Sequence, residues 1–178
     1  EYAQELSQLQ SQAPPMGPAF VRRRMMAELG PEWAARYKSF EPQPAASASL
    51  GQVHRAVGHD GRALAVKLQY PDMQSAVEAD LNQLKVVFAL HARMNPAVET
   101  GEMLKEVAAR LREELNYDLE ARHMALYALI FKDEPRIRVP EWRRELSTRR
   151  LLAMTWLEGG RLLDYKTAPL EARNAIAK

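Results

Sequence analysis

The spacing of apolar residues predicts helices at the N-terminal end of the chain. Apolar positions recur at helical intervals within residues 2–13, 18–29 and 31–40. Pro14-Pro15 stops the first of these segments, and a proline near the first position suits the start of the other two. We therefore expect residues 1–40 to form a helical N-terminal extension.

The pattern becomes strand-like between residues 39 and 70. Residues 52–57 and 63–69 flank the segment Gly58-His-Asp-Gly61, which is typical of a β-hairpin connection. Strand character returns at residues 137–139 and again at residues 150–157. These segments predict an antiparallel sheet.

Two long helical segments separate these groups of strands. They cover about residues 72–94 and 99–132 and are divided by Asn95-Pro96. A shorter helical tail follows Gly159-Gly160. The order of elements predicts an α+β fold with an antiparallel sheet and helices packed to one side.

Composition and charge exclude several classes of function. The 178 residues are 47% hydrophobic and 27% charged, with a formal net charge of +2. This near-neutral charge argues against a nucleic-acid binder, so the basic cluster Arg22–Arg24 is read as a solvated helix face. The absence of cysteine excludes disulfides and cysteine-based zinc sites, and no uncharged apolar run is long enough to span a bilayer.

The candidate chemistry centres on Lys67 in an apolar strand. It follows the small-residue segment Ala45–Ser49, and the arrangement is that of a kinase-type N-lobe, which covers and neutralises nucleotide phosphates. Kinases use glycine in such a loop, whereas alanine costs about 1 kcal/mol or more at positive φ, so this loop is expected to be stiffer. Two plainer interpretations are a solvent-facing strand lysine and a simple small-residue turn.

The acidic segment after residue 112 offers partners for Lys67. On one continuous helix, Glu114 and Glu120 would lie roughly 120° apart, so that one could reach the lysine while the other faces another part of the site. The alternative is an acidic helix surface paired with Arg112 and Arg122.

Three segments resemble the signature of the UbiB family, atypical kinase-like proteins also called AarF-domain-containing kinases and linked to ubiquinone biosynthesis. They are Pro44-Ala-Ala-Ser-Ala-Ser-Leu-Gly-Gln-Val-His54, Ala65-Val-Lys-Leu-Gln-Tyr-Pro71 and Glu114-Leu-Asn-Tyr-Asp-Leu-Glu-Ala121. The resemblance implies a kinase-like N-lobe with two long helices inserted between its third and fourth strands.

The resemblance also implies roles for individual residues. Lys67 would face the phosphates, with Glu120 as its helix partner. Glu114 and position 116 would form the family's Glu-x-Asp pair, but this chain has the uncharged Asn116 there, which weakens any contact with magnesium. Met154 would stand beside the adenine, and backbone groups of Thr155 and Leu157 would bind it. The residues implied in the Ala-rich loop are Ala45, Ala46, Ser47, Ala48 and Ser49.

The resemblance further implies ATP and Mg²⁺ as cofactors. Expected partners are a membrane surface or proteins of quinone biosynthesis, and the expected location is the cytoplasmic side of a bacterial membrane or the mitochondrion.

The expected division of the chain is an extension at 1–40, an N-lobe at 41–158 and the start of a hinge at 159–178. The catalytic aspartate and the family's Lys-x-Gly-Gln motif are missing from the sequence, so we expect a piece of a larger protein that does not turn over ATP alone. The alternative is a non-catalytic, pseudokinase-type module that binds a partner or a membrane.

Overall fold

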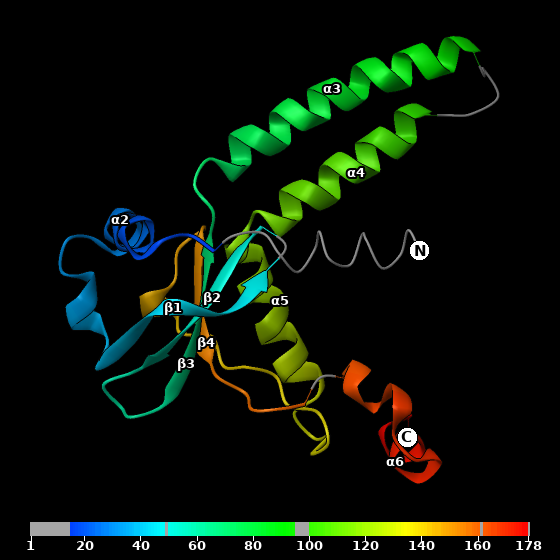
Figure 1. The fold of residues 1–178 in the computed structure, drawn as a ribbon. Coiled ribbons are helices and arrows are strands. Elements are labelled where there is room, and N and C mark those ends of the chain that lie inside the picture. The colour runs from blue at the N-terminus through cyan, green and yellow to red at the C-terminus, as the bar shows by residue number, and fades with distance from the viewer. Residues whose placement is uncertain (1–14, 49, 95–99, 161, 178) are drawn as a thin grey trace.

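The computed structural model describes residues 15–48, 50–94, 100–160 and 162–177, so the helix expected before Pro14 lies outside the described residues. The fold is α+β, as the sequence predicts, but helices lie on both faces of the antiparallel sheet and not on one side alone (Figure 1). In chain order the elements are α2 (Pro18–Leu29), η1 (Trp33–Arg36), β1 (Ser39–Ala48), β2 (Gly51–Val57), β3 (Ala63–Gln69), α3 (Met73–Met94), α4 (Thr100–Glu114), α5 (Tyr117–Ile130), η2 (Arg144–Leu146), β4 (Leu151–Thr155), η3 (Leu162–Thr167) and α6 (Leu170–Ala177).

The four strands lie in the order β1-β2-β3-β4, and each neighbouring pair is antiparallel. The predicted hairpin between β2 and β3 is present. Gly51 begins β2 where a Cβ atom would collide with the carbonyl oxygen of Leu68 on β3, so only glycine allows this close pairing.

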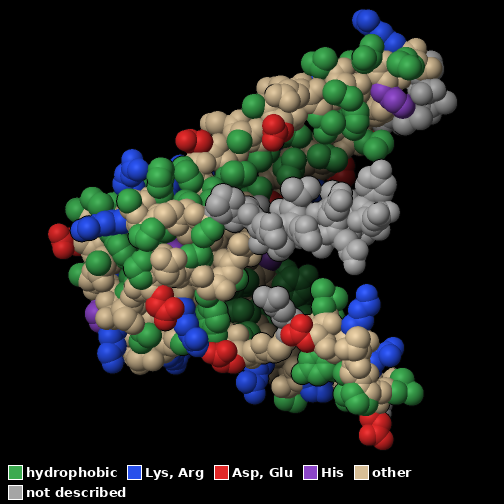
Figure 2. Space-filling view, in the orientation of Figure 1, with side chains coloured by type: hydrophobic (Ala, Val, Ile, Leu, Met, Phe, Trp, Pro, Cys, Tyr) green, Lys and Arg blue, Asp and Glu red, His purple; other side chains and the backbone are tan. Residues whose placement is uncertain are grey.

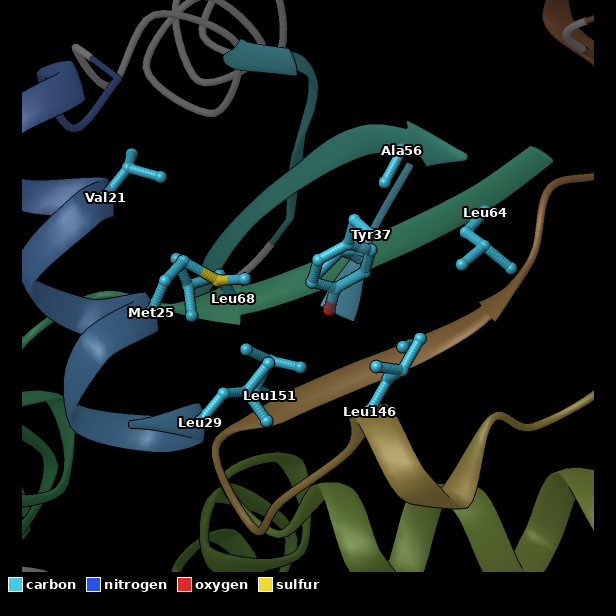
Figure 3. Close-up of a cluster of buried hydrophobic side chains, with 11 residues drawn as sticks. Val21, Met25, Leu29, Tyr37, Ala56, Leu64, Leu68, Leu146 and Leu151 are labelled. Atoms are coloured by element: carbon cyan, nitrogen blue, oxygen red, sulfur yellow. The ribbon is translucent and has the colours of Figure 1, made fainter. Parts of the chain in front are cut away.

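One face of the sheet carries the main hydrophobic core. α2 packs on this face through Val21, Met25 and Leu29 (Figure 3). Fully burying a side chain of this size contributes about 1.5–3 kcal/mol. The strand side chains in the cluster alternate along their strands, as expected when one face is buried, and they are Ala56, Leu64, Val66, Leu68, Leu151 and Ala153.

α3 and α4 form a long hairpin that extends away from the sheet (Figure 1). Near the sheet the hairpin has its own core around Val77 and Leu81. Both oxygens of Glu78 accept hydrogen bonds from Arg112, at 2.8 and 2.9 Å, and so join the two helices. Farther out, hydrophobic side chains lie on the surface (Figure 2), among them Val86, Val87, Leu90, Met94 and Met103.

Four sequence-based assignments are wrong in detail. Residues 45–48, expected in a loop, are the last part of strand β1 and pair with β2. The expected helix 99–132 is two helices, α4 and α5. Residues 137–139 form no strand, because they do not pair with the sheet. Phe40 lies in β1, because the helical segment after Pro31 is only the short turn η1.

A chain of buried polar groups connects the start of the described chain to the sheet. The backbone N–H of Met16 donates to Oε1 of Gln52 at 2.8 Å, and Nε2 of Gln52 donates to Nε2 of His54 at 2.8 Å. The opposite ring nitrogen of His54 lies 2.9 Å from the carbonyl oxygen of Glu41, to which it donates. This arrangement requires a neutral imidazole, because Nε2 must accept a hydrogen bond.

Burial lowers the pKa of His54 below its ordinary value of 6.5, and the hydrogen bond to Glu41 only partly opposes this effect. The folded state therefore binds fewer protons than the unfolded state, so neutral His54 stabilises the fold above the unfolded pKa. That contribution is lost as the pH falls below about 6.5. We predict that the free energy of unfolding, measured by urea denaturation, decreases between about pH 7 and about pH 5.5.

His54→Gln should remove most of this pH dependence, because glutamine does not titrate. The matched control is His59→Gln, since His59 is exposed and bonded only to the carbonyl oxygen of Ala35 in the described structure. A pH dependence that survives in His54→Gln would show that other groups cause it.

Candidate functional site

An ion pair between Lys67 and Glu120 joins the sheet to α5. Nζ of Lys67 lies 2.9 Å from Oε1 and 2.8 Å from Oε2 of Glu120. The ammonium group also lies 4.7 Å from the centre of the Tyr117 ring. The Lys67 side chain is 18% exposed and that of Glu120 is 35% exposed, so the pair is accessible from one side.

Lys67 points away from the main core because of strand alternation. Its neighbours Val66 and Leu68 are fully buried against α2, so Lys67 lies on the opposite face. The solvent-facing alternative is therefore only partly right. The lysine leaves the core, but its head group is held by a carboxylate instead of lying free in water.

The break between α4 and α5 places Glu120. The backbone N–H of Tyr117 donates to the carbonyl oxygen of Arg149 at 3.0 Å, which attaches the first turn of α5 to the turn before β4. Tyr117 and Ala121 are buried against Leu152 of β4. Burial, reinforced by the charges of Glu120 and Glu114, raises the pKa of Tyr117, so its phenol stays neutral.

Asn116 caps α5. Its side-chain oxygen accepts a hydrogen bond from the backbone N–H of Leu119 at 3.4 Å. Asparagine is one of the preferred N-cap residues, because its side chain satisfies an amide that has no partner within the helix. Glu114 and Glu120 thus belong to two helices, and the angle expected from one continuous helix does not apply.

The face of the sheet that carries Lys67 is only partly covered. In the strand register, Val53 lies opposite Lys67, Lys67 opposite Leu152, and Ala65 opposite Met154. Partners in adjacent strands point to the same face, so Val53, Ala65 and Met154 surround the lysine with apolar surface. The search for motifs missed Val53 and Ala65. Val53 lies two residues before Arg55 on β2, and Ala65 lies two residues before Lys67 on β3. This alternation was the signal that could have identified them.

The Ala-rich segment lies at the edge of the same surface. Ala46 pairs with Val53 and is therefore in line with Lys67 across two strand spacings, roughly 10 Å. Asp72 is the only residue other than glycine with positive φ in the described part of the chain. Ala45–Ala48 therefore carry no left-handed strain, and the expected penalty for alanine does not arise there. Ser49 lies outside the described residues.

A cleft of about 280 Å³ opens beside the ion pair. Its lining residues come from β3, α4 and α5 and are Lys67, Arg110, Glu113, Glu114, Leu119, Glu120 and His123. Two cations and three carboxylates give this lining a formal charge of −1 with histidine neutral. Arg110 lies on α4 and is bound to Glu106 and Glu113. Lys67, on β3, is the cation that lines the sheet side of the cleft.

The implied adenine-binding residues lie at the end of β4. Met154 packs beside Trp142 and the start of α5. The backbone N–H of Thr155 is used within the fold, donating to the carbonyl oxygen of Glu141 at 3.0 Å, and its hydroxyl accepts from the N–H of Glu141. Leu157 lies beyond the sheet and is 43% exposed.

Comparisons with known proteins show which family this chain belongs to. Residues 8–178 match the family model described as the ABC1 atypical kinase-like domain. The chain is 30% identical to the mitochondrial atypical kinase COQ8 of Saccharomyces cerevisiae over 97% of its own length and 34% of that protein. It is 35% identical to AarF domain-containing protein kinase 1 of Gallus gallus, over 92% of this chain and 32% of that protein.

This chain belongs to the ABC1 atypical kinase-like family. Its fold is similar to the solved structure of Rv3197 from Mycobacterium tuberculosis in complex with erythromycin, with a TM-score of 0.81 and 34% identity over 98% of this chain and 44% of that one. The chain spans about a third of the length of the two curated relatives.

Two further findings concern ligands and membranes. Within the described residues, no three histidine, aspartate or glutamate side chains come together as a metal site. No helix in the same residues is both long and apolar enough to cross a membrane.

The capping role of Asn116 in this ABC1 domain can be tested by substitution. We predict that Asn116→Ala lowers the free energy of unfolding by about 0.5–2 kcal/mol, because an N-cap bond is lost. Asn116→Asp should leave it nearly unchanged, since aspartate caps a helix equally well. Urea denaturation measures both, and equal destabilisation by alanine and aspartate would contradict the capping role.

Proposed function

We propose that the full-length protein binds Mg-ATP on the open face of the sheet and acts as an atypical kinase or ATPase in support of ubiquinone biosynthesis. The base would lie against Val53, Ala65 and Met154, and the phosphates would meet Lys67 beneath the Ala-rich segment. The observation that carries this proposal is the Lys67–Glu120 ion pair on an apolar, partly uncovered sheet face.

The surface suits the two parts of a nucleotide. A purine base needs a flat apolar surface, and small or β-branched side chains such as Ala65 and Val53 leave room for one. Phosphates need a cation, and an ammonium group has three N–H donors. Two of those of Lys67 point to Glu120, so a third is available for a phosphate oxygen.

Glu120 and Tyr117 would keep the lysine in position before the nucleotide arrives. A lysine side chain loses up to about 2 kcal/mol of rotamer entropy when it is fixed. In this chain the carboxylate and the aromatic ring already hold the amine, so part of that loss precedes binding. This is a positioning role for Glu120, with Lys67 as the group that touches phosphate.

Magnesium would enter with the nucleotide. The described residues hold no preformed cluster of metal ligands, and the cleft lining has an excess of negative charge. Mg²⁺ commonly binds through substrate phosphates plus one or two carboxylates, and Glu114, which the family resemblance assigns to the Glu-x-Asp pair, is one of the carboxylates that line the cleft. Asn116 brings no charge and is occupied as a helix cap.

The competing proposal is a non-catalytic, pseudokinase-type module that binds a partner protein or a membrane surface instead of a nucleotide. The uncharged Asn116 and the negative cleft lining favour it. It differs from the first proposal in one measurable property, the affinity of the protein for Mg-ATP.

We predict that Lys67→Ala in the full-length protein weakens Mg-ATP binding at least about tenfold by isothermal titration calorimetry, because the phosphates lose their cation. The free energy of unfolding should change little, since the partly exposed Glu120 carboxylate can be hydrated. Lys105→Ala is the matched control, as Lys105 is exposed on α4 and paired only with Glu102 in the described structure. Unchanged affinity in Lys67→Ala would contradict the proposal, and absence of ATP binding in the wild type would favour the non-catalytic module.

A further inference from the structure

Arg55 of β2 extends the open sheet face toward the end of β4. It pairs with Ala65 of β3, which in turn pairs with Met154 of β4, so all three side chains lie on one face. Trp156 follows Met154 by two residues and points the same way. The guanidinium carbon of Arg55 lies 4.8 Å from the centre of the Trp156 ring.

The same guanidinium forms an ion pair with Glu158. Nη2 of Arg55 donates to Oε1 of that carboxylate. One side chain of β2 therefore contacts the residues immediately before and after Leu157. This connection reaches a segment that has left the sheet, since residues 156–160 form no regular element.

Among the described residues, few other hydrogen bonds and ion pairs hold this segment. The N–H of Trp156 donates to the carbonyl oxygen of Ala63 at 2.9 Å, which is the last backbone bond of the ladder. Beyond it, Arg55 supplies the contact that fixes Glu158. Leu157 therefore lies between a residue bonded to the sheet and two residues that Arg55 contacts.

We propose that Arg55 is a positioning residue that holds the backbone of residues 156–158 for recognition of the base edge of a purine nucleotide. The inference rests on the proposed function and deepens it. Arg55 acts through Trp156 and Glu158, so it would set affinity for the base while Lys67 sets affinity for the phosphates.

The exposure of this ion pair distinguishes the positioning role of Arg55 from a contribution to folding stability. The Arg55 and Glu158 side chains are 41% and 75% exposed, and exposed ion pairs contribute little to folding stability. The value of Arg55 lies in its planar group, which stacks on an indole and bonds a carboxylate at the same time. Lysine keeps the charge but cannot reproduce both contacts.

The test compares three probes on the full-length protein by competition against a fluorescent ATP analogue: Mg-ATP, adenosine and inorganic tripolyphosphate. Arg55→Ala is expected to weaken the binding of Mg-ATP and of adenosine by about five- to tenfold. The affinity for tripolyphosphate should stay within about twofold of the wild type. Lys67→Ala should have the opposite effect, weakening the binding of Mg-ATP and tripolyphosphate more than the binding of adenosine. The adenosine affinity of Arg55→Lys should lie between those of the wild type and Arg55→Ala.

Arg112→Ala is the matched control, because Arg112 has similar exposure and also bridges two elements, α3 and α4, away from the open face. It should change none of the three affinities. The charge exchange Arg55→Glu with Glu158→Arg should recover part of the adenosine binding that Arg55→Glu alone loses, because it restores the ion pair but not the stacking on Trp156.

Three outcomes would overturn the inference. If Arg55→Ala binds adenosine as the wild type does, the positioning role fails while the proposed function stands. If Arg55→Ala loses adenosine and tripolyphosphate equally, its effect is general and not directed at the base. If the wild type binds neither adenosine nor Mg-ATP, the proposed function fails and this inference fails with it.

Discussion

The contact between the Lys67 ammonium and the Glu120 carboxylate is the constraint on which the site depends. It needs a strand residue turned away from the core and a helix whose first turns lie beside β4. The chain meets the second need by ending α4 and starting α5 at Asn116, with the amide of Tyr117 bonded to Arg149. Because the ion pair is only partly buried, it orders the lysine without isolating it from a ligand.

The sheet divides structural and chemical roles between its two faces. The face under α2 is filled mainly by hydrophobic side chains, both aliphatic and aromatic, and their burial helps to hold β2, β3 and β4 together. The other face has Lys67 among Val53, Ala65 and Met154 and is covered mainly near β4 by α5. A binding surface can remain open on one side because the other side already supplies the core.

Sequence reasoning identified the sheet, the β2–β3 hairpin and the pairing of Lys67 with Glu120, the last through resemblance to a family. It missed the helix break, because the apolar spacing continues across Leu115, while the start of α5 is attached to the turn before β4 by a tertiary hydrogen bond from Tyr117 to Arg149. It also assigned residues 137–139 to a strand on β-branched character alone, although strand formation requires a partner. Small residues at 45–48 suggested a loop, but pairing with β2 makes them a strand.

The most direct test of the account is chemical labelling of Lys67 by an ATP derivative that carries an acyl group on its terminal phosphate. A lysine Nζ held beside the phosphates attacks the acyl carbonyl, forms an amide and releases ATP. Peptide mass spectrometry of the full-length protein should find the amide on Lys67, and excess Mg-ATP should suppress it. Labelling that avoids Lys67, or that Mg-ATP does not suppress, would contradict a nucleotide site on this face of the sheet.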